Sequence, residues 1–197
     1  MAVLVILVAM AAPSFLLLKP ATLTAEGDQF EAFCKLVRSE AIANRTVYRI
    51  GFVVESDNAD EVFRRYASWR WDKISKTFVQ DSDWKQLADH LVFESSHSDY
   101  FKGSRYAQNE PHTVRGKFLL SGENGETFEV VSRSEITRVL RYVSFTPSGR
   151  PKPIDDGTRH FSLIIRPVSE GDAKSEIKNW IQLNIDTLTG RTQSYRP

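Results

Sequence analysis

Residues 28–43 read DQFEAFCKLVRSEAIA, and the rest of the fold is predicted outward from this stretch. Its apolar side chains recur at helical spacing, with charged residues on the opposite face. This apolar stripe consists of Phe30, Phe33, Cys34, Val37 and Ala41. The pattern predicts an amphipathic helix packed on a core, in which the single cysteine, Cys34, is a buried apolar residue and not a reactive thiol.

The residues before this helix form an uncharged run. Residues 2–18 read AVLVILVAMAAPSFLLL and are followed by Lys19 and Pro20. As a helix the run is about 26 Å long, close to the hydrocarbon thickness of about 30 Å. We predict a transmembrane anchor over residues 1–20 and a short linker over 21–27. A cleaved signal peptide, with Ala9-Met10-Ala11 as cleavage box, and a buried core helix remain alternatives.

The orientation of this run is weakly specified by its flanking charges. Lys19 and Lys35 follow it, and no basic residue precedes it. Counting Lys and Arg alone weakly favours a cytoplasmic C-terminal side. The bare N-terminus suggests a missing basic leader.

After the linker, residues 28–197 are predicted to form a single domain. Two more helices are expected in its first half, over about 58–76 and after Asp81-Ser82-Asp83, because apolar residues recur there at helical spacing. Between the first two helices, residues 46–54 (TVYRIGFVV) are typical of a strand or a link.

The second half of the domain changes to a period of two. Strands are expected over 113–120, within 126–145, and around 161–165 and 177–185, with hairpin turn chemistry at Asn124-Gly125. Helices followed by strands predict an α+β fold. After the N-terminal transmembrane helix, about three helices would pack on a curved antiparallel sheet of about four strands.

The composition is that of a globular protein. Of 197 residues, 41% are hydrophobic, 26% charged and 11% aromatic, which excludes wholesale disorder and a multi-span membrane protein. The net charge of +1 gives no general attraction to nucleic acid. A single cysteine excludes an intramolecular disulfide and a Cys-rich zinc module.

No motif of catalytic chemistry is present. The four histidines, His90, His97, His112 and His160, lack the spacing of metal ligands. There is no G-x-S-x-G elbow and no phosphate-binding glycine loop. Asp155-Asp156 lies in a turn-rich loop, where carboxylates cap backbone amides. We predict no catalytic residue, no metal site and no cofactor.

Two surface features are candidate interaction sites. Arg133, Arg138 and Arg141, with Arg115 nearby, would form a basic stripe for nucleic acid. The alternating Glu129 and Glu135 predict an ion-paired sheet face instead. Neither a nucleic acid nor a small-molecule partner is therefore predicted.

The second feature is an aromatic cluster. Clustered Trp and Tyr side chains either cover the hydrophobic core or contribute most of the binding energy of an interface. On a helix, Trp69 and Trp71 point about 200° apart, so one of the two would face outward. The predicted interaction residues are Trp69, Trp71, Tyr66 and Trp84.

Taken together, this layout resembles the single-span inner-membrane assembly proteins of bacterial conjugation and type IV secretion machines. The resemblance rests on the span over residues 2–18, on Asp83-Trp84-Lys85-Gln86-Leu87-Ala88 after an aromatic-rich segment, and on the strands over 113–187. It implies a nuclear-transport-factor-two-like domain in the periplasm, held to the inner membrane by a single-pass anchor.

The resemblance also implies a non-enzymatic assembly component that associates with itself and with other proteins of the machine. Two alternatives remain open: a secreted or anchored protein that binds a small ligand, and an enzyme of the same cone-shaped fold.

Overall fold

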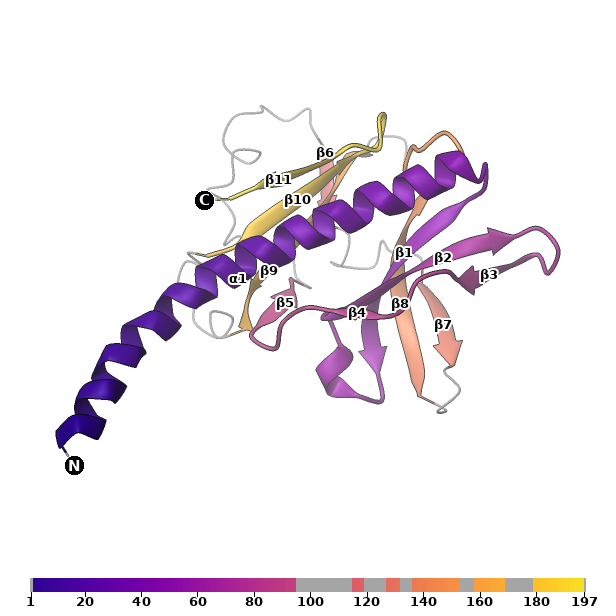
Figure 1. The fold of residues 1–197 in the computed structure, drawn as a ribbon. Helices are drawn as coiled ribbons and strands as arrows, with labels where there is room; N and C mark the ends of the chain where they lie inside the picture. Colours follow the sequence, from indigo (N-terminus) through magenta and orange to yellow (C-terminus); the bar gives the residue numbers. More distant parts are fainter. Residues whose placement is uncertain are drawn as a thin grey trace.

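One long helix, α1 (Ala2–Ala43), begins the chain and lies along one side of the molecule (Figure 1). The computed structural model describes residues 2–94, 115–118, 127–131, 136–152, 158–168 and 179–196, with the backbone alone for 2–21, 115–118, 131 and 158–160. The helix has 42 residues, which corresponds to about 63 Å. It includes the helix predicted over 28–43 and continues through 21–27, where a linker was expected.

The first sheet has the strand order β3-β2-β1-β8-β7, and every pairing in it is antiparallel. A 3₁₀ turn, η1 (Ala59–Glu61), connects β1 to β2. The short β4 pairs with β2 on the same side as β3. The strands are β1 (Tyr48–Ser56), β2 (Arg65–Asp72), β3 (Thr77–Gln80), β4 (Lys85–Gln86), β7 (Thr127–Val131) and β8 (Thr137–Phe145).

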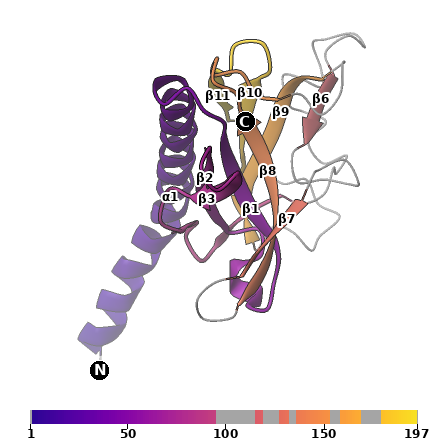
Figure 2. The same ribbon diagram turned by 90° about the vertical axis from the view of Figure 1, so that its right-hand side faces the viewer.

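The second sheet has the order β11-β10-β9-β5, with β6 parallel to β9. Its strands are β5 (Leu91–Phe93), β6 (Arg115–Phe118), β9 (Thr158–Pro167), β10 (Ile181–Asp186) and β11 (Thr192–Tyr195). Seen from the side, α1 stands on one side of both sheets (Figure 2). It contacts β1 and β8 of the first sheet and β9, β10 and β11 of the second.

The main core lies between α1 and the inner faces of the two sheets. Phe30 of α1 is fully buried, and its ring contacts Phe52 and Tyr66 of the first sheet and Phe93 of the second. At Gly27, an added Cβ would lie 2.7 Å from Ile181, so α1 approaches β10 closely there. The apolar stripe predicted over 28–43 therefore holds the two sheets together.

The C-terminal part of α1 is tied to two turns by Arg38. Its Nε donates to the carbonyl oxygens of Gly149, 3.1 Å away, and Thr189, 3.2 Å away. One turn follows β8 and the other joins β10 to β11. This side chain therefore joins α1 to a turn of each sheet.

A second apolar cluster covers the face of the first sheet that points away from α1, here called the outer face. It is centred on Trp69, Val53, Ala67 and Leu140. Because residues two apart on a strand share a face, Trp69 and Trp71 both project outward while Tyr66 projects into the main core. The first sheet is therefore covered with apolar side chains on both sides.

The predicted helices over 58–76 and after residue 83 are wrong: these residues form η1, β2, β4 and β5. Tyr66, Ala67, Ser68 and Trp69 are all buried, because β2 is covered on both faces. Such a strand shows no alternation of polar and apolar residues, and its apolar positions can match a helical spacing by chance.

The predicted fold class is therefore wrong. One long helix packs on eleven strands in two sheets among the described residues, instead of three helices on a sheet of about four strands. The predicted transmembrane helix is corrected as well, since none of the helices in the described part of the chain is both long and apolar enough to cross a membrane.

Gly51 of β1 makes room for the Trp69 ring. A Cβ at this position would lie 2.6 Å from Trp69 Cζ3, and the ring is held on other sides by Trp84 and Phe128. We expect Gly51→Ala to lower the free energy of unfolding by about 1–3 kcal/mol through overpacking, measured by urea denaturation. The double variant Gly51→Ala/Trp69→Phe should recover part of this loss, and a purely additive double variant would contradict the explanation.

Candidate functional site

Among the described residues, the outer face of the first sheet carries most of the aromatic side chains outside the main core. They pack mainly edge-on: Trp69 lies 5.4 Å from Trp84 and 5.1 Å from Phe128, and Trp71 lies 5.1 Å from Phe78, between ring centroids. We call this surface the aromatic face, and its rings are Trp69, Trp71, Phe78, Trp84, Phe128 and Tyr142.

The structure brings three of the four predicted interaction residues together. Trp69, Trp71 and Trp84 lie on the aromatic face, whereas Tyr66 is 1% exposed inside the main core. Trp69 is 2% exposed, and Trp71 and Trp84 are half-buried. The helical argument that one of Trp69 and Trp71 must face outward does not apply, because both lie on β2 and share a face.

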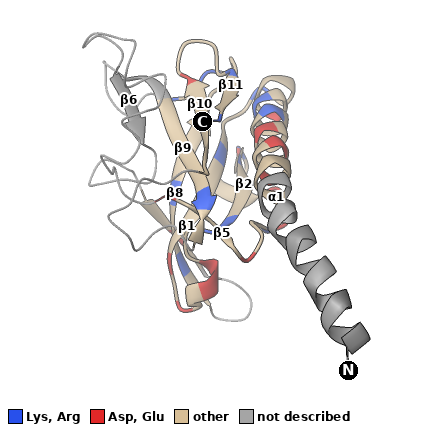
Figure 3. Cartoon of the chain, turned by 90° about the vertical axis from the view of Figure 1, so that its left-hand side faces the viewer, with Lys and Arg blue, Asp and Glu red and all other residues tan. Residues whose placement is uncertain are grey.

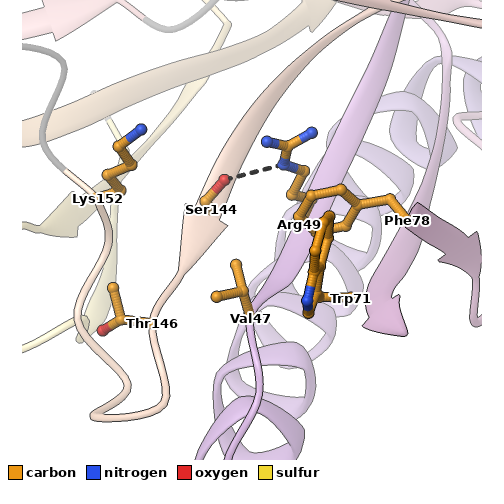
Figure 4. A pocket seen from close by; sticks show the side chains of 7 residues that line it. All are labelled: Val47, Arg49, Trp71, Phe78, Ser144, Thr146 and Lys152. Carbon is orange, nitrogen blue, oxygen red and sulfur yellow. Dashed lines mark hydrogen bonds between the residues drawn. The ribbon is translucent and has the colours of Figure 1, made fainter. Parts of the chain in front are cut away.

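A groove opens at the edge of the aromatic face, between the start of β1, the end of β8 and the β2–β3 hairpin. Its volume is about 250 Å³. Val47 and Ser144 lie at its centre, with Trp71 and Phe78 on one side and Thr146 and Lys152 on the other (Figure 4). The full lining is Val47, Arg49, Trp71, Phe78, Ser144, Thr146 and Lys152.

Arg49 is held in place by rings and by a hydroxyl group. Its guanidinium carbon lies 3.6 Å from the centroid of Phe78 and 3.9 Å from that of Tyr142. Its Nε donates to Ser144 Oγ at 3.3 Å (Figure 4). Stacking between two rings favours the charged guanidinium and fixes its orientation. The groove therefore contains an ordered positive charge.

The turn after β8 brings a second cation to the groove. The Lys152 amide donates to the Ser144 carbonyl oxygen at 2.7 Å, which returns the chain alongside β8. Within the turn, Gly149 has a φ of 75°, a conformation that favours glycine. Lys152 thus stands across the groove from Trp71 (Figure 4). The groove combines two cations with apolar walls.

A buried ion cluster lies elsewhere in the first sheet. Glu61 of η1 and Arg138 of β8 are each 4% exposed, and Arg138 Nη2 donates to Glu61 Oε1 at 2.9 Å. Arg65 pairs with the same carboxylate, and the Arg138 guanidinium lies 5.2 Å from the Trp84 ring centroid. Hydrogen bonding from Arg138 lowers the pKa of Glu61, against the opposing effect of burial. The surrounding β1–β2 loop is acidic (Figure 3).

The arginines of the predicted basic stripe do not form one surface among the described residues. Arg138 is buried in this ion cluster, so its charge is paired with Glu61. Arg133 lies outside the described residues, and the side chain of Arg115 is not described. Glu94, a second buried carboxylate, pairs with Arg166. Both buried carboxylates in the described part of the chain are thus neutralised by arginine.

The remaining candidate residues do not converge on a site. Burial raises the pKa of the Cys34 thiol above its ordinary value, in agreement with a core role. His90 is half-buried on the segment before β5. His97, His112, Asp155 and Asp156 lie outside the described residues, and the His160 side chain is not described. No metal-binding cluster is found among the residues that the structure describes.

Most residues of the groove are not recognisable from the sequence. Arg49 lies within the apolar strand TVYRIGFVV, where a lone arginine at an alternating position signals a stacked or functional cation. Phe78, Ser144, Thr146 and Lys152 carried no signal of their own. They meet because the strand register places Arg49 opposite Ser144 and Trp71 opposite Phe78.

This architecture, a long N-terminal helix packed on two sheets, is similar to that of a solved minor pseudopilin. No protein-family model matches the chain, and no curated protein matches it. The similarity to solved structures is at the level of the fold, with 12–14% sequence identity.

The minor pseudopilin EpsH from the type II secretion system of Vibrio cholerae aligns with 89% of this chain and 97% of its own, at a TM-score of 0.50 and 12% identity. A second structure of EpsH aligns with 90% of this chain and 96% of its own, at a TM-score of 0.49 and 14% identity. The type IV minor pilin FimU of Pseudomonas aeruginosa PAO1 aligns with 89% of this chain and 92% of its own, at a TM-score of 0.45 and 12% identity.

This result overturns the predicted resemblance. The chain has the fold of EpsH and not a nuclear-transport-factor-two-like domain, so the assignments to type IV secretion and conjugation are wrong. The predicted location, a single pass through the inner membrane with a periplasmic domain, is corrected too, because the described residues contain no membrane-spanning helix.

Proposed function

We propose that this chain is a non-enzymatic structural subunit of a secretion or pilus machine of the pseudopilin type. One observation carries the proposal: the fold of EpsH, a minor pseudopilin of type II secretion, extends over 89% of this chain and 97% of EpsH. The alignment therefore extends over most of both chains. The pairing of both described buried carboxylates with arginine is also in keeping with a structural role.

Such a subunit works by contacts with copies of itself and with other proteins of the machine. The aromatic face supplies the candidate contact residues Trp69, Trp71 and Trp84, since Trp and Arg are enriched at interface hot spots. Tyr66 contributes through the core, where it supports α1.

Deletion of the gene in its native host tests the proposal. We expect loss of protein secretion into the medium or loss of surface pili, restored by the wild-type gene on a plasmid. Chemical cross-linking in the complemented strain should capture pilin-like proteins on this chain. Normal secretion and normal pili in the deletion strain would overturn the proposal.

A further inference from the structure

We infer that the tip of the β2–β3 hairpin binds an acidic turn at the end of β1 in a second copy of this chain. The hairpin tip consists of residues 73–76 (KISK), and the acidic turn consists of residues 55–60 (ESDNAD). The inference rests on the proposed function, because it names one contact between copies of the same assembly subunit. The complementary charges of the two segments identify the partner.

The hairpin tip holds an isoleucine in solvent. Ile74 is 94% exposed, more than any other large hydrophobic side chain among the described residues. The hairpin extends away from the rest of the first sheet (Figure 1). The carboxylate of Asp72 accepts hydrogen bonds from the backbone amides of Ile74 at 3.2 Å and Ser75 at 3.0 Å, which orders the tip. Little backbone freedom therefore remains to be lost when a partner covers Ile74.

Two lysines flank this isoleucine. Lys73 and Lys76 are both exposed, and neither forms an ion pair within the part of the chain that the structure describes. The tip thus presents an apolar side chain between two uncompensated positive charges. Charge complementarity steers association and suppresses wrong partners, so a tip of this kind selects an acidic surface.

The acidic turn carries the complementary charge. Glu55, Asp57 and Asp60 are exposed and have no ion pair to any described residue. This end of the first sheet is acidic (Figure 3). Asp57 also accepts a hydrogen bond from the backbone amide of Thr137, which ties the turn to β8. Ala59, between Asp57 and Asp60 in the sequence, is exposed and offers Ile74 a small apolar contact.

The two segments lie at opposite ends of β2. This strand begins after η1 and ends at the hairpin tip, and its eight residues span about 26 Å. A tip therefore does not reach the acidic turn of its own chain, and the contact forms between copies. Because the two contacting surfaces differ, repetition of the contact links copies head to tail into an open chain or a ring.

Sedimentation equilibrium of the full-length chain tests the charges. We expect association that continues beyond dimers and is about tenfold weaker at about 0.5 M than at about 0.05 M sodium chloride, since salt screens exposed charges. Lys73→Glu/Lys76→Glu and Glu55→Lys/Asp60→Lys should each abolish it. A mixture of the two variants should restore association, because each tip then meets a turn of opposite charge. No association of the wild type, or no recovery in the mixture, would overturn the inference.

A matched pair of variants tests the apolar part of the contact. Ile74→Ser should weaken association about fivefold or more, because it removes the side chain that the partner covers. Leu188→Ser changes a side chain that is 65% exposed between β10 and β11, outside both segments, and should have no effect. Unfolding curves confirm that each variant folds. Equal effects of the two variants would indicate unspecific apolar aggregation and refute the inference.

A lipid surface is another partner for a basic tip with an apolar side chain, and the same variants distinguish it. In co-sedimentation with phosphatidylglycerol vesicles, the wild type should bind no better than Lys73→Glu/Lys76→Glu. Vesicle binding that depends on these lysines, without self-association, would assign the tip to a membrane and contradict the inference.

The inference and the proposed function fail in different ways. If copies associate through the hairpin tip while deletion of the gene leaves secretion and pili normal, the assembly role is wrong. If deletion abolishes secretion or pili while the purified chain does not associate, the assembly role stands and the hairpin tip is not its contact site.

Discussion

Replacing Glu61 by alanine should destabilise the protein by about 3–5 kcal/mol, since it leaves Arg138 charged and buried without its partner. Arg138 is 4% exposed and binds Glu61 through two hydrogen bonds. The cluster joins η1 to β8 across the first sheet, and Arg65 would lose the same carboxylate. Urea denaturation at pH 7 measures the effect.

Two further variants separate the charge from the packing. Asp60→Ala removes the exposed neighbouring carboxylate and should change stability by no more than about 0.5 kcal/mol. The double variant Glu61→Leu/Arg138→Met replaces the pair by apolar groups and should recover most of the loss. A Glu61→Ala protein within about 1 kcal/mol of the wild type would show that the pair is not coupled to folding.

The same cluster predicts a pH dependence. The pKa of Glu61 is lowered in the folded protein, chiefly by hydrogen bonds from Arg138, so the folded state releases this proton more readily than the unfolded chain does. The stabilisation is therefore complete above the unfolded pKa of about 4.3 and is lost as the pH falls through the folded pKa. The stability difference between wild type and Glu61→Gln should be constant near neutral pH and shrink below about pH 4.3. A difference that grows on acidification would contradict this sign.

Replacing Phe30 by alanine should also cost about 3–5 kcal/mol of unfolding free energy. The ring is fully buried where α1 meets both sheets. Its centroid lies 5.0, 5.4 and 5.7 Å from the ring centroids of Tyr66, Phe93 and Phe52, respectively. Its loss opens a cavity between rigid strands and removes favourable aromatic pairs. Denaturation midpoints and slopes for the full chain measure the change.

Leu36 provides the matched control on the same helix. It is 56% exposed, so Leu36→Ala should change stability by no more than about 0.5 kcal/mol. Equal losses for the Phe30 and Leu36 variants would mean that helix propensity, and not docking of α1 on the sheets, controls stability.

The local pattern of the sequence was sufficient for the helix over 28–43, which is buried on one face. The stripe from Phe30 to Ala41 predicts a helix because one side meets the core and the other meets water, and the structure places that helix in α1. Residues 46–54, for which the sequence leaves both a strand and a link between helices open, overlap β1, where β-branched and aromatic residues are concentrated.

The same reasoning failed for β2 and for the number of sheets. Residues 65–72 read RYASWRWD and lack the β-branched residues typical of strands. Burial on both faces removes the alternation that would reveal a strand, and a helical spacing of Tyr66 and Trp69 takes its place. Which sheet a strand joins depends on pairing partners far away in the chain, and no local pattern encodes them.

By itself, therefore, the sequence determined the helix over 28–43 and the buried state of Cys34, because each follows from the period of neighbouring residues. Tertiary structure alone decided that Trp69 and Trp71 share a face, that Glu61 meets Arg138, and that Arg49 and Lys152 line one groove. The last two pairs consist of residues that are dozens of positions apart in the chain. They depend on strand register, which is set by the packing of the whole sheet against α1 and not by any single segment.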